Sequence, residues 1–495
     1  MSLATLLTDT AAKFADRPAL KLDDAVLNYA LLNEAATRVA GLLKDKGVAP
    51  GDRVGIMLPN VPYFGAVYYG ILRAGGVVVP MNVLLKGREV GFYLGDSGAK
   101  VLFAWHGFEE AAREGATDAE LILVTPNEFE KLLMGAPRAP EDEPRAGDDT
   151  AVILYTSGTT GTPKGAELTH DNLRQNCTVT AKTLIDVGEE DVILGALPLF
   201  HSFGQTCGLN AAIAHGACLT LIPRFDPAKA LQIIERDRVT VLEGVPTMYH
   251  AMLNVPEPSD TASLRVCVTG GSAMPGEVMR AFEKKFDCII LEGYGLSETS
   301  PVASFNHPDA ERKAGSIGTP IAGVEMKVVD DEGDDVEQGG VGEIVIRGHN
   351  VMKGYWNRPD ATADVMRDGW FATGDMATVD DDGYFFIVDR KKDMIIRGGY
   401  NVYPREIEEV LYEHPAVSEA AVVGVPDDAL GEEVAAAVVL KTGAEASADD
   451  IRAYVKERVA AYKYPRQIWF SSELPKGPTG KILKREIKAP SEVEQ

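Results

Sequence analysis

The chain is long, acidic and of ordinary globular composition. It has 495 residues, of which 45% are hydrophobic and 25% charged, and its formal net charge is −25 at pH 7. This length exceeds one ordinary core, so two or more domains are expected. The negative charge argues against a nucleic-acid partner. An anionic substrate would need a local positive field built from lysines, arginines and backbone amides.

The cysteines and the N-terminal residues both indicate a cytoplasmic protein. The five cysteines form no CxxC pair and have no zinc-ligand spacing: Cys177, Cys207, Cys218, Cys267 and Cys288. Such a sparse, odd set is typical of reduced thiols in an intracellular protein. Residues 1–10 lack the basic start and long apolar stretch of a signal peptide. No run approaches the ~20 apolar residues of a membrane span.

The first part of the chain alternates helical and strand-like patterns. Apolar residues at helical spacing predict helices over 33–46 and 63–72, and apolar runs predict strands over 53–58, 75–80 and 151–154. This β-α-β alternation implies a parallel sheet covered by helices.

The alternation resumes over 191–300 and then gives way to short β-rich runs. Further buried strands are predicted at 218–222, 239–242, 264–268 and 288–291. Beyond about residue 315, runs such as 324–329 and 342–347 alternate with acidic turns, which predicts a small β subdomain. The acidic turn at 330–335 lacks the spacing of an EF-hand, so we expect a solvated hairpin tip and no calcium site.

The last ~105 residues are expected to form a separate α+β unit. One helix begins at Pro404, and Ser447 with Asp450 forms a capping box for a second helix. Strands predicted at 420–425 and 434–440 lie between these helices.

Residues 155–165 carry the strongest functional signal in the chain. They read Tyr-Thr-Ser-Gly-Thr-Thr-Gly-Thr-Pro-Lys-Gly and follow the strand at 151–154 directly. Amides, hydroxyls and a lysine that converge on one point suit a polyphosphate, and the alternative is a flexible surface loop. Lys164 is followed by Gly165, so the segment is not a Walker A loop. Residues 166–173, which come next, are expected to begin a helix.

Four more motifs occur in a fixed order after this loop. They are Gly-Tyr-Gly-Leu-Ser-Glu-Thr at 293–299, Asp-Gly-Trp-Phe-Ala-Thr-Gly-Asp at 368–375, Asp-Arg-Lys-Lys-Asp-Met-Ile at 389–395 and Pro-Lys-Gly-Pro-Thr-Gly-Lys-Ile at 475–482. Together the five motifs resemble those of the adenylate-forming superfamily, which comprises acyl-CoA synthetases, firefly-type luciferases and non-ribosomal peptide adenylation domains. The resemblance runs from about residue 10 to about residue 487.

The resemblance implies an α/β fold in two domains. Residues 1–389 would form a large N-terminal domain of parallel-rich sheets flanked by helices, with the small β subdomain at 315–389. Residues 390–392 would form a hinge, and residues 393–495 a small, mobile α+β C-terminal domain.

The resemblance also implies ATP, Mg²⁺ and coenzyme A as cofactors and assigns their contacts. The loop residues expected to hold the β- and γ-phosphates are Thr156, Ser157, Gly158, Thr159, Thr160, Gly161, Thr162 and Lys164. Further nucleotide contacts are expected at Gly271, Ser272, Ala273, Gly293, Tyr294, Gly295, Thr299, Asp375 and Arg390. Among them, Tyr294 would stack on adenine, Asp375 would bind the ribose hydroxyls, and Arg390 would bind ribose or phosphate. Glu298 resembles the Mg²⁺ ligand, with Thr156 as its hydroxyl partner. Alternatively, Glu298 caps a helix over 297–305.

Lys481 is the residue expected to catalyse adenylation. Gly477 and Gly480 predict an exposed loop able to enter a cleft, where a lysine supplies positive charge as a carboxylate attacks the α-phosphate. If the family pattern is left aside, the alternative interpretation is that Lys481 is one solvated lysine in a run of basic residues.

The hinge motif implies that the C-terminal domain presents two different faces. Lys392 occupies the pivot position of the family and is also expected near the nucleotide. After rotation, the glycines Gly398 and Gly399 would let the pantetheine arm of coenzyme A pass close to the adenylate.

Several residues bear on the acid that is activated. His201 either borders the carboxylate and the acyl tunnel or packs against Phe200 and Phe203. The other pocket candidates are apolar and mostly small, consistent with an uncharged acyl chain: Met274, Gly295, Val302 and Ala303. Malonyl-CoA synthetases need an arginine near Glu277, whose opposite charge argues against dicarboxylic acids.

Segments 352–362 and 396–408 look most like those of bacterial fatty-acid–CoA ligases. The expected function is an ATP-dependent acid–thiol ligase that forms acyl-AMP, releases pyrophosphate and transfers a medium- or long-chain acyl group to coenzyme A. Two alternatives share the catalytic residues: an aryl-CoA ligase for cinnamate- or benzoate-like acids, and a stand-alone adenylation enzyme that loads a carrier protein. Peripheral contact with a membrane, and either a monomer or a homodimer, are compatible with the sequence.

Overall fold

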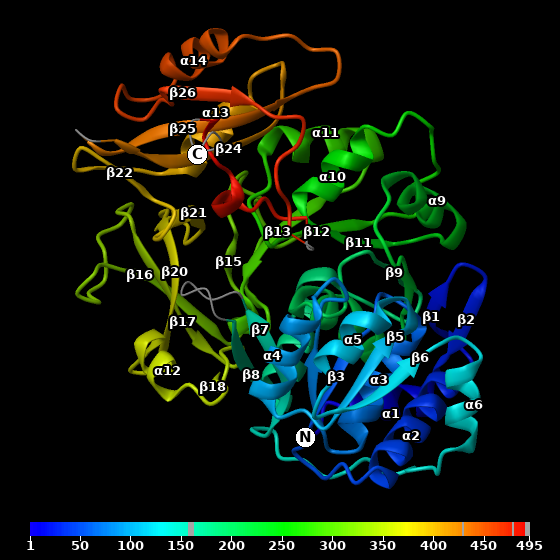
Figure 1. The fold of residues 1–495 in the computed structure, drawn as a ribbon. Coiled ribbons are helices and arrows are strands. Elements are labelled where there is room, and N and C mark those ends of the chain that lie inside the picture. The colour runs from blue at the N-terminus through cyan, green and yellow to red at the C-terminus, as the bar shows by residue number, and fades with distance from the viewer. Residues whose placement is uncertain (157–162, 428–429, 478–479, 491–495) are drawn as a thin grey trace.

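A computed structural model of the chain describes residues 1–156, 163–427, 430–477 and 480–490. The described residues form two large sheets, a smaller β subdomain and a C-terminal α+β unit (Figure 1). In Figure 1 the C-terminal unit lies above the larger N-terminal body, and the β subdomain lies to one side. The predicted α/β fold class is confirmed.

The first large sheet fixes both ends of the phosphate-loop segment. Its strands, in order across the sheet, are β18 (Gly354–Tyr355), β8 (Lys164–Thr169), β7 (Thr150–Thr156), β4 (Val77–Pro80), β3 (Arg53–Met57), β5 (Val101–Trp105) and β6 (Glu120–Val124). Strands β7, β4, β3, β5 and β6 run parallel, as the β-α-β pattern predicts. Thr156 pairs with Lys164 across the β7–β8 ladder.

The helix expected at 166–173 is wrong over its first half. Residues 164–169 form β8, which pairs antiparallel with β7. The helix begins only at His170, because Thr169 caps it by accepting a hydrogen bond from the backbone N–H of Asn172. Pairing with β7 therefore outweighs the local helical pattern.

The second large sheet carries the segments that form the floor of the candidate site. Its strands, in order, are β15 (Thr319–Pro320), β14 (Val302–Phe305), β13 (Ile290–Gly295), β12 (Val266–Thr269), β11 (Val241–Gly244), β9 (Val192–Gly195), β10 (Cys218–Leu221), β1 (Pro18–Leu22) and β2 (Ala25–Asn28). Six neighbouring strands run parallel: β1, β10, β9, β11, β12 and β13. Strands β2, β14 and β15 add antiparallel edges. Strands β11, β12 and β13 begin at Val241, Val266 and Ile290, two residues later than predicted.

Helices separate and cover the two large sheets. They are α1 (Thr5–Lys13), α2 (Tyr29–Asp45), α3 (Pro62–Arg73), α4 (Gly87–Ser97), α5 (Glu109–Gly115), α6 (Glu128–Gly135), α7 (His170–Val179), α8 (Ala211–His215), α9 (Pro227–Asp237), α10 (Pro246–Leu253) and α11 (Gly276–Phe286). Helix α3 contacts β3 and β4 of one sheet and β1 of the other, and α2 packs along α3. One hydrophobic core therefore runs through both sheets. Within the described ranges, no helix is long and apolar enough to cross a membrane.

The β subdomain and the C-terminal unit have separate sheets. The subdomain consists of β16 (Val324–Val329), β17 (Gly342–Gly348), β19 (Met366–Arg367), β20 (Trp370–Val379) and β21 (Phe385–Arg390), with α12 (Pro359–Val365) beside them. The C-terminal unit consists of β22 (Ile395–Arg397), β23 (Tyr400–Val402), α13 (Pro404–Tyr412), β24 (Val417–Asp427), β25 (Gly431–Leu440), α14 (Ala448–Lys456) and β26 (Gln467–Phe470), and it has a core of its own. The predicted capping box is present: the Ser447 hydroxyl accepts from the Asp450 N–H at 3.1 Å.

Candidate active site

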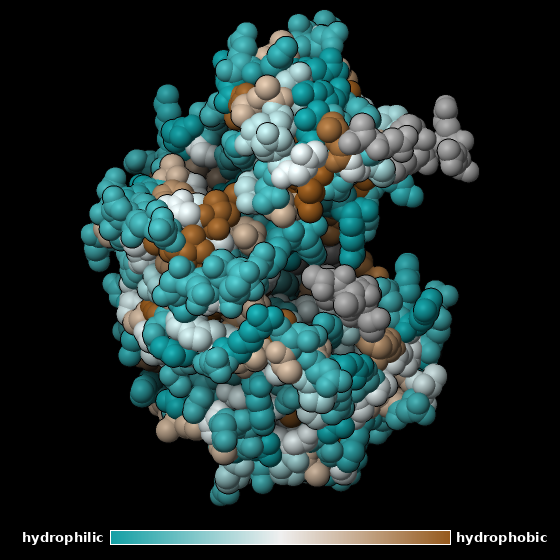
Figure 2. Space-filling view, turned by 90° about the vertical axis from the view of Figure 1, so that its left-hand side faces the viewer, coloured by the Kyte–Doolittle hydropathy of each residue, from teal (hydrophilic) through white to brown (hydrophobic). Residues whose placement is uncertain are grey.

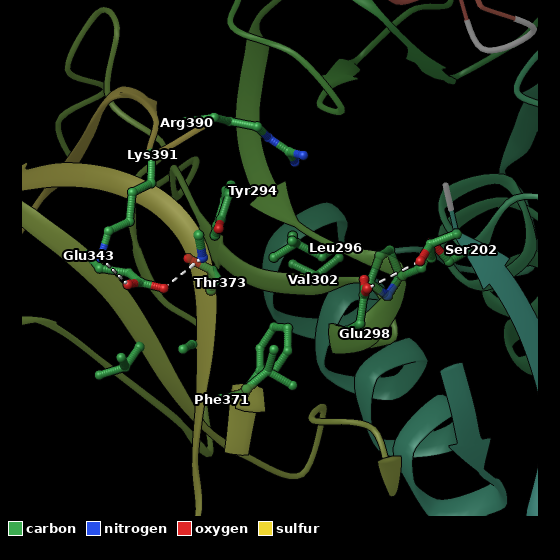
Figure 3. A pocket seen from close by; sticks show the side chains of 18 of the residues that line it. Ser202, Tyr294, Leu296, Glu298, Val302, Glu343, Phe371, Thr373, Arg390 and Lys391 are labelled. Carbon is green, nitrogen blue, oxygen red and sulfur yellow. Dashed lines mark hydrogen bonds and ion pairs between the residues drawn. The ribbon is translucent and has the colours of Figure 1, made fainter. Parts of the chain in front are cut away.

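A cavity of about 800 Å³ lies where the three parts of the molecule meet. Its walls come from the ends of β7 and β8, the β13–β14 hairpin, strand β20 of the subdomain, residues 390–392, and Lys481 of the C-terminal unit. Figure 2 shows a hollow between the C-terminal unit at the top and the body below it. In Figure 3, Arg390 points its guanidinium into the open space and Glu298 lies on the opposite side.

Glu298 is held in the cavity wall by two hydroxyl groups. Its Oε1 accepts hydrogen bonds from Tyr355 at 3.0 Å and from Thr156 at 3.4 Å. The Lys164 ammonium lies 5.3 Å from the centre of the Tyr355 ring. Both hydroxyls bind the same carboxylate oxygen, so Oε2 remains as a hard oxygen ligand. This group fits a magnesium ion that phosphate oxygens also bind.

A tight turn between β13 and β14 presents Glu298 to the cavity. The Thr299 hydroxyl accepts from the Leu296 N–H at 2.8 Å, and the Thr299 N–H donates to the Leu296 carbonyl at 3.0 Å. The Glu298 carbonyl accepts from the Met352 N–H at 2.8 Å. The turn is a single 3₁₀ turn over 297–299, followed by strand β14, so the alternative helix over 297–305 is wrong.

Asp375 links Tyr294 to Arg390 behind the cavity surface. One carboxylate oxygen accepts from the Tyr294 hydroxyl at 2.6 Å, and the other pairs with the Arg390 Nε at 3.0 Å. Burial and the neighbouring carboxylate both raise the pKa of Tyr294, and the charge of Asp375 raises the pKa of Arg390. Tyr294 and Arg390 line the cavity. Asp375 lies just behind them and is 3% exposed.

Lys481 and His201 meet the cavity from opposite domains. The turn that carries Lys481 is closed by a hydrogen bond of 2.8 Å from the Gly477 N–H to the Lys481 carbonyl. Surrounding protein and then Arg390 lower the pKa of Lys481 to about 8, although its side chain keeps contact with water in the open cavity. Burial and then the charge of Lys481 lower the pKa of His201 to about 4. His201 is therefore a neutral imidazole near pH 7.

The remaining sequence-predicted residues divide into three groups. Gly271, Gly293, Gly295 and Lys392 line the cavity. Ser272, Ala273 and Thr299 are not part of its lining, and Gly398 and Gly399 form an exposed turn between β22 and β23, away from it. The loop residues Ser157, Gly158, Thr159, Thr160, Gly161 and Thr162 lie outside the described residues.

Comparison with known proteins decides the family. A model of the AMP-binding enzymes matches residues 7–356, and a model of the C-terminal domain of AMP-binding enzymes matches residues 406–481. The chain belongs to the adenylate-forming superfamily.

Full-length relatives define its class within that superfamily. A long-chain-fatty-acid–CoA ligase of Bacillus subtilis is 39% identical over 98% of this chain and 94% of its own length. A feruloyl-CoA synthase of Amycolatopsis is 41% identical over 95% of both chains. ATP-bound MatB of Rhodopseudomonas palustris is 33% identical and superposes with a TM-score of 0.92 over 98% of both chains, whereas its apo form gives 0.81. The chain is an acyl-CoA synthetase, an enzyme that uses ATP and coenzyme A.

Two residues of the synthetase's cavity escaped prediction from the sequence. Tyr355 holds Glu298, and Lys391 pairs with Asp331 at 2.6 Å and with Glu343 at 3.4 Å. Tyr355 lies in the segment 352–362, whose sequence indicates only a resemblance to fatty-acid–CoA ligases. Its role depends on the pairing of the short strand β18 with β8, which local sequence does not encode.

The acid-pocket candidates are only partly brought together in the synthetase. Gly295, Val302 and Phe203 line the cavity, whereas Phe200, Met274 and Ala303 pack behind it. Glu277 is exposed on α11, pairs with Arg280 and faces a separate crevice. Its charge therefore gives no argument against dicarboxylic acids.

Proposed function

We propose that the synthetase activates a medium- or long-chain fatty acid as acyl-AMP and then transfers the acyl group to coenzyme A. In the first step a carboxylate oxygen attacks the α-phosphorus of ATP, a new P–O bond forms, and the bond to pyrophosphate breaks. The observation that carries the proposal is that Lys481, Arg390 and Glu298 line one cavity, in which Arg390 lies opposite Glu298 (Figure 3).

Positive charge is what this step needs most, because two anions must approach each other. We propose that Lys481 neutralises the carboxylate and the bridging oxygen as the new bond forms. Lys164 and Thr156 would hold the terminal phosphates, together with the predicted residues 157–162. Mg²⁺ bound by Glu298 and Thr156 would neutralise further phosphate charge.

The neutral state of His201 restricts its part in the reaction. Its Nδ1 accepts a hydrogen bond from the Phe203 N–H at 3.3 Å, so Nε2 carries the proton. We propose that His201 borders the carboxylate and donates this N–H to it, without transferring a proton. Tyr294 would stack on adenine, and Asp375 and Arg390 would bind ribose. The Asp375 carboxylate would exchange one of its two protein partners for a ribose hydroxyl.

The second step requires a different face of the C-terminal domain. We propose residues 1–389 and 393–495 as the two domains, with 390–392 as the hinge and Lys392 as its pivot. Here Lys481 reaches the cavity while Gly398 and Gly399 face solvent, so this orientation suits adenylation. The better superposition on the ATP-bound form of MatB supports that reading.

A second candidate function is an aryl-CoA ligase. The 41% identity to a feruloyl-CoA synthase favours it, and Gly295 and Val302 leave a small apolar wall that suits a planar ring.

We also propose a cytoplasmic location. All five cysteines are buried free thiols, which supports this location, and cell fractionation would test it.

CoA-dependent AMP release separates these readings. The purified enzyme is given ATP, Mg²⁺, coenzyme A and single acids from acetate to oleate, together with benzoate and cinnamate. Release with medium- and long-chain acids supports the main proposal, and release with the aromatic acids alone supports the second. ATP–pyrophosphate exchange without coenzyme A consumption would instead indicate loading of a carrier protein.

A further inference from the structure

Unpaired polar atoms gather behind the part of the cavity wall that residues 201–203 form. The hydroxyls of Ser202 and Thr206, the Gln205 Oε1 and the Glu243 Oε1 have no hydrogen-bond partner among the described residues. All four side chains are buried, with exposures of 1% or less. Each unpaired buried group costs about 1–3 kcal/mol, so four on neighbouring elements call for a ligand or a functional reason.

Glu243 faces the π-helix η3 (Gly204–Asn210) from strand β11. A Cβ at Gly208 would lie 3.2 Å from the Glu243 Oε2, so a larger residue there would press on the carboxyl and shift it by a few tenths of an ångström. Burial raises the pKa of Glu243 to about 8. Near pH 7 the side chain is therefore a neutral carboxylic acid that can both donate and accept a hydrogen bond.

Helix η3 leads from the cavity to this carboxyl. Residues 201–203, directly before it, line the cavity, and Ser202 lies on the pocket wall on the same side as Glu298 (Figure 3). The helical rise from Ser202 to Gly208 covers roughly 9 Å. Val245, two residues beyond Glu243 on the chain, also lines the cavity, which brings Glu243 within roughly 7 Å of it along the strand.

We propose that Glu243, with Thr206 and Gln205, forms a polar floor of the acyl pocket that selects acids carrying a hydroxyl group roughly 9 Å from the carboxylate. This inference rests on the proposed function and narrows its substrate class to medium-chain or aryl acids, since a floor at this depth leaves no room for a long chain. A neutral carboxyl matches a hydroxyl, which also donates and accepts once. An ammonium group would need the ionised form, which burial disfavours.

The energetics favour strong selection. An acid that ends in a methyl group leaves the four polar atoms unpaired, whereas a hydroxyl satisfies Glu243 directly. Sites built to hydrogen-bond a substrate hydroxyl reject the analogue lacking it far more strongly than apolar pockets reject an added group. We expect the wild-type enzyme to prefer the hydroxylated acid at least tenfold in kcat/KM.

Matched pairs of acids test this directly. CoA-dependent AMP release is measured for 8-hydroxyoctanoate against octanoate and for 4-hydroxycinnamate against cinnamate, so the two pairs distinguish an aliphatic from an aromatic substrate. A preference of tenfold or more in either pair supports the polar floor. Equal turnover within both pairs overturns it, while leaving the acyl-CoA synthetase assignment intact. Failure of every acid to release AMP would instead overturn the proposed function.

Variants test whether the Glu243 carboxyl causes the preference for hydroxylated acids. Glu243→Leu is expected to abolish the preference and to raise kcat/KM for octanoate, and Glu243→Gln to keep part of it, because an amide also donates and accepts. Glu292→Gln is the matched control, since Glu292 is a buried carboxyl on β13 whose Oε1 accepts from the Met274 N–H at 3.1 Å. Thermal unfolding confirms that each variant folds. A Glu243→Leu enzyme that folds and keeps the wild-type ratio contradicts the proposal.

Discussion

A change at Lys481 should impair the first half-reaction, adenylation, and spare the second, transfer to coenzyme A. Lys481 enters the cavity from the C-terminal unit. Lys481→Ala should lower ATP–pyrophosphate exchange by at least a hundredfold, because the positive charge acts in the transition state of adenylation. Attack of coenzyme A on chemically prepared acyl-AMP should remain within a few-fold of wild type.

The neighbouring Lys476 provides the matched control for this change. It lies on the same turn but pairs with Glu419 at 2.6 Å and does not line the cavity. Lys476→Ala should leave both half-reactions intact. Equal losses in both half-reactions for Lys481→Ala would show that the lysine is only structural.

Tyr355→Phe tests the support given to Glu298. The change removes one hydrogen bond to the carboxylate and keeps the ring over which Lys164 lies. A hydrogen bond to a charged group is worth about 1.5–3 kcal/mol, so Mn²⁺ should bind the enzyme–ATP complex about tenfold more weakly, measured by electron paramagnetic resonance without acid. Tyr384→Phe, which loses a hydrogen bond to the Glu311 carbonyl far from the cavity, should bind Mn²⁺ normally. Unchanged binding in Tyr355→Phe would remove Tyr355 from the site.

Single residues were predictable where a family motif marked them. Lys164, Glu298, Tyr294 and Lys481 lie in motifs that resemble those of the adenylate-forming superfamily, and they meet at one cavity. Thr299 is a different case, because its hydroxyl is used inside the turn that presents Glu298. A motif gives residue types, whereas the direction of each side chain depends on how the turn closes.

The β13–β14 hairpin is the element that sets the position of Glu298. Its strands approach so closely that a Cβ at Gly295 would lie 1.7 Å from the Pro301 carbonyl oxygen. Gly295→Ala must therefore push the turn outward, at a cost of about 3 kcal/mol. We expect a lower denaturation midpoint and weaker ATP binding, measured by denaturant unfolding and by calorimetry.

A glycine with open space around it gives the contrast. A Cβ at Gly95 in helix α4 meets no atom within 4 Å. Gly95→Ala should stabilise the protein by roughly 0.5–1 kcal/mol, because alanine is the better helix former. If Gly295→Ala bound ATP and unfolded like wild type, the close packing of the hairpin would not matter for the site.

Elements were predictable where local interactions decide them. Ser447 and Asp450 cap α14 as their spacing indicates, since the bonds lie within one turn. Residues 166–169 were misassigned because their partner is β7, and ladder pairing is not written in the strand's own sequence. The two-residue β18 was missed for the same reason.

At the scale of the whole molecule, an enzyme of net charge −25 concentrates cations at one place. Lys164, Arg390, Lys391, Lys392 and Lys481 all line the cavity. The last of these comes from the C-terminal unit, so rotation of that unit would change the local field as well as the shape. The sequence predicted four of these residues and named Lys391 only within the hinge. It did not predict the orientation that unites them, because that orientation depends on polar contacts between segments far apart in the chain.

Polar contacts hold the present orientation. Arg405 of the C-terminal unit donates hydrogen bonds to three residues of the N-terminal part: Asp389, Ile387 and Gly315. Two more contacts join α10 to the C-terminal unit. The Thr247 hydroxyl donates to the Gly480 carbonyl at 3.2 Å, and the His250 Nε2 lies 3.2 Å from the Ser418 hydroxyl. Thr247 and His250 are on α10, whereas Gly480 and Ser418 belong to the C-terminal unit. Polar contacts of this kind suit an interface that opens in the proposed catalytic cycle.

Locking this interface should therefore stop the cycle halfway. The double variant His250→Cys, Ser418→Cys would be joined by a short, reducible thiol linker, which spares the five native thiols because all are buried. The linked enzyme should keep ATP–pyrophosphate exchange near the wild-type rate but form acyl-CoA at least a hundredfold more slowly, and reduction should restore it. The single variants treated with the linker control for its chemistry. Normal acyl-CoA formation by the linked enzyme would mean that coenzyme A reaches the adenylate without rotation of the C-terminal domain, and the roles given to Lys392, Gly398 and Gly399 would then fail together.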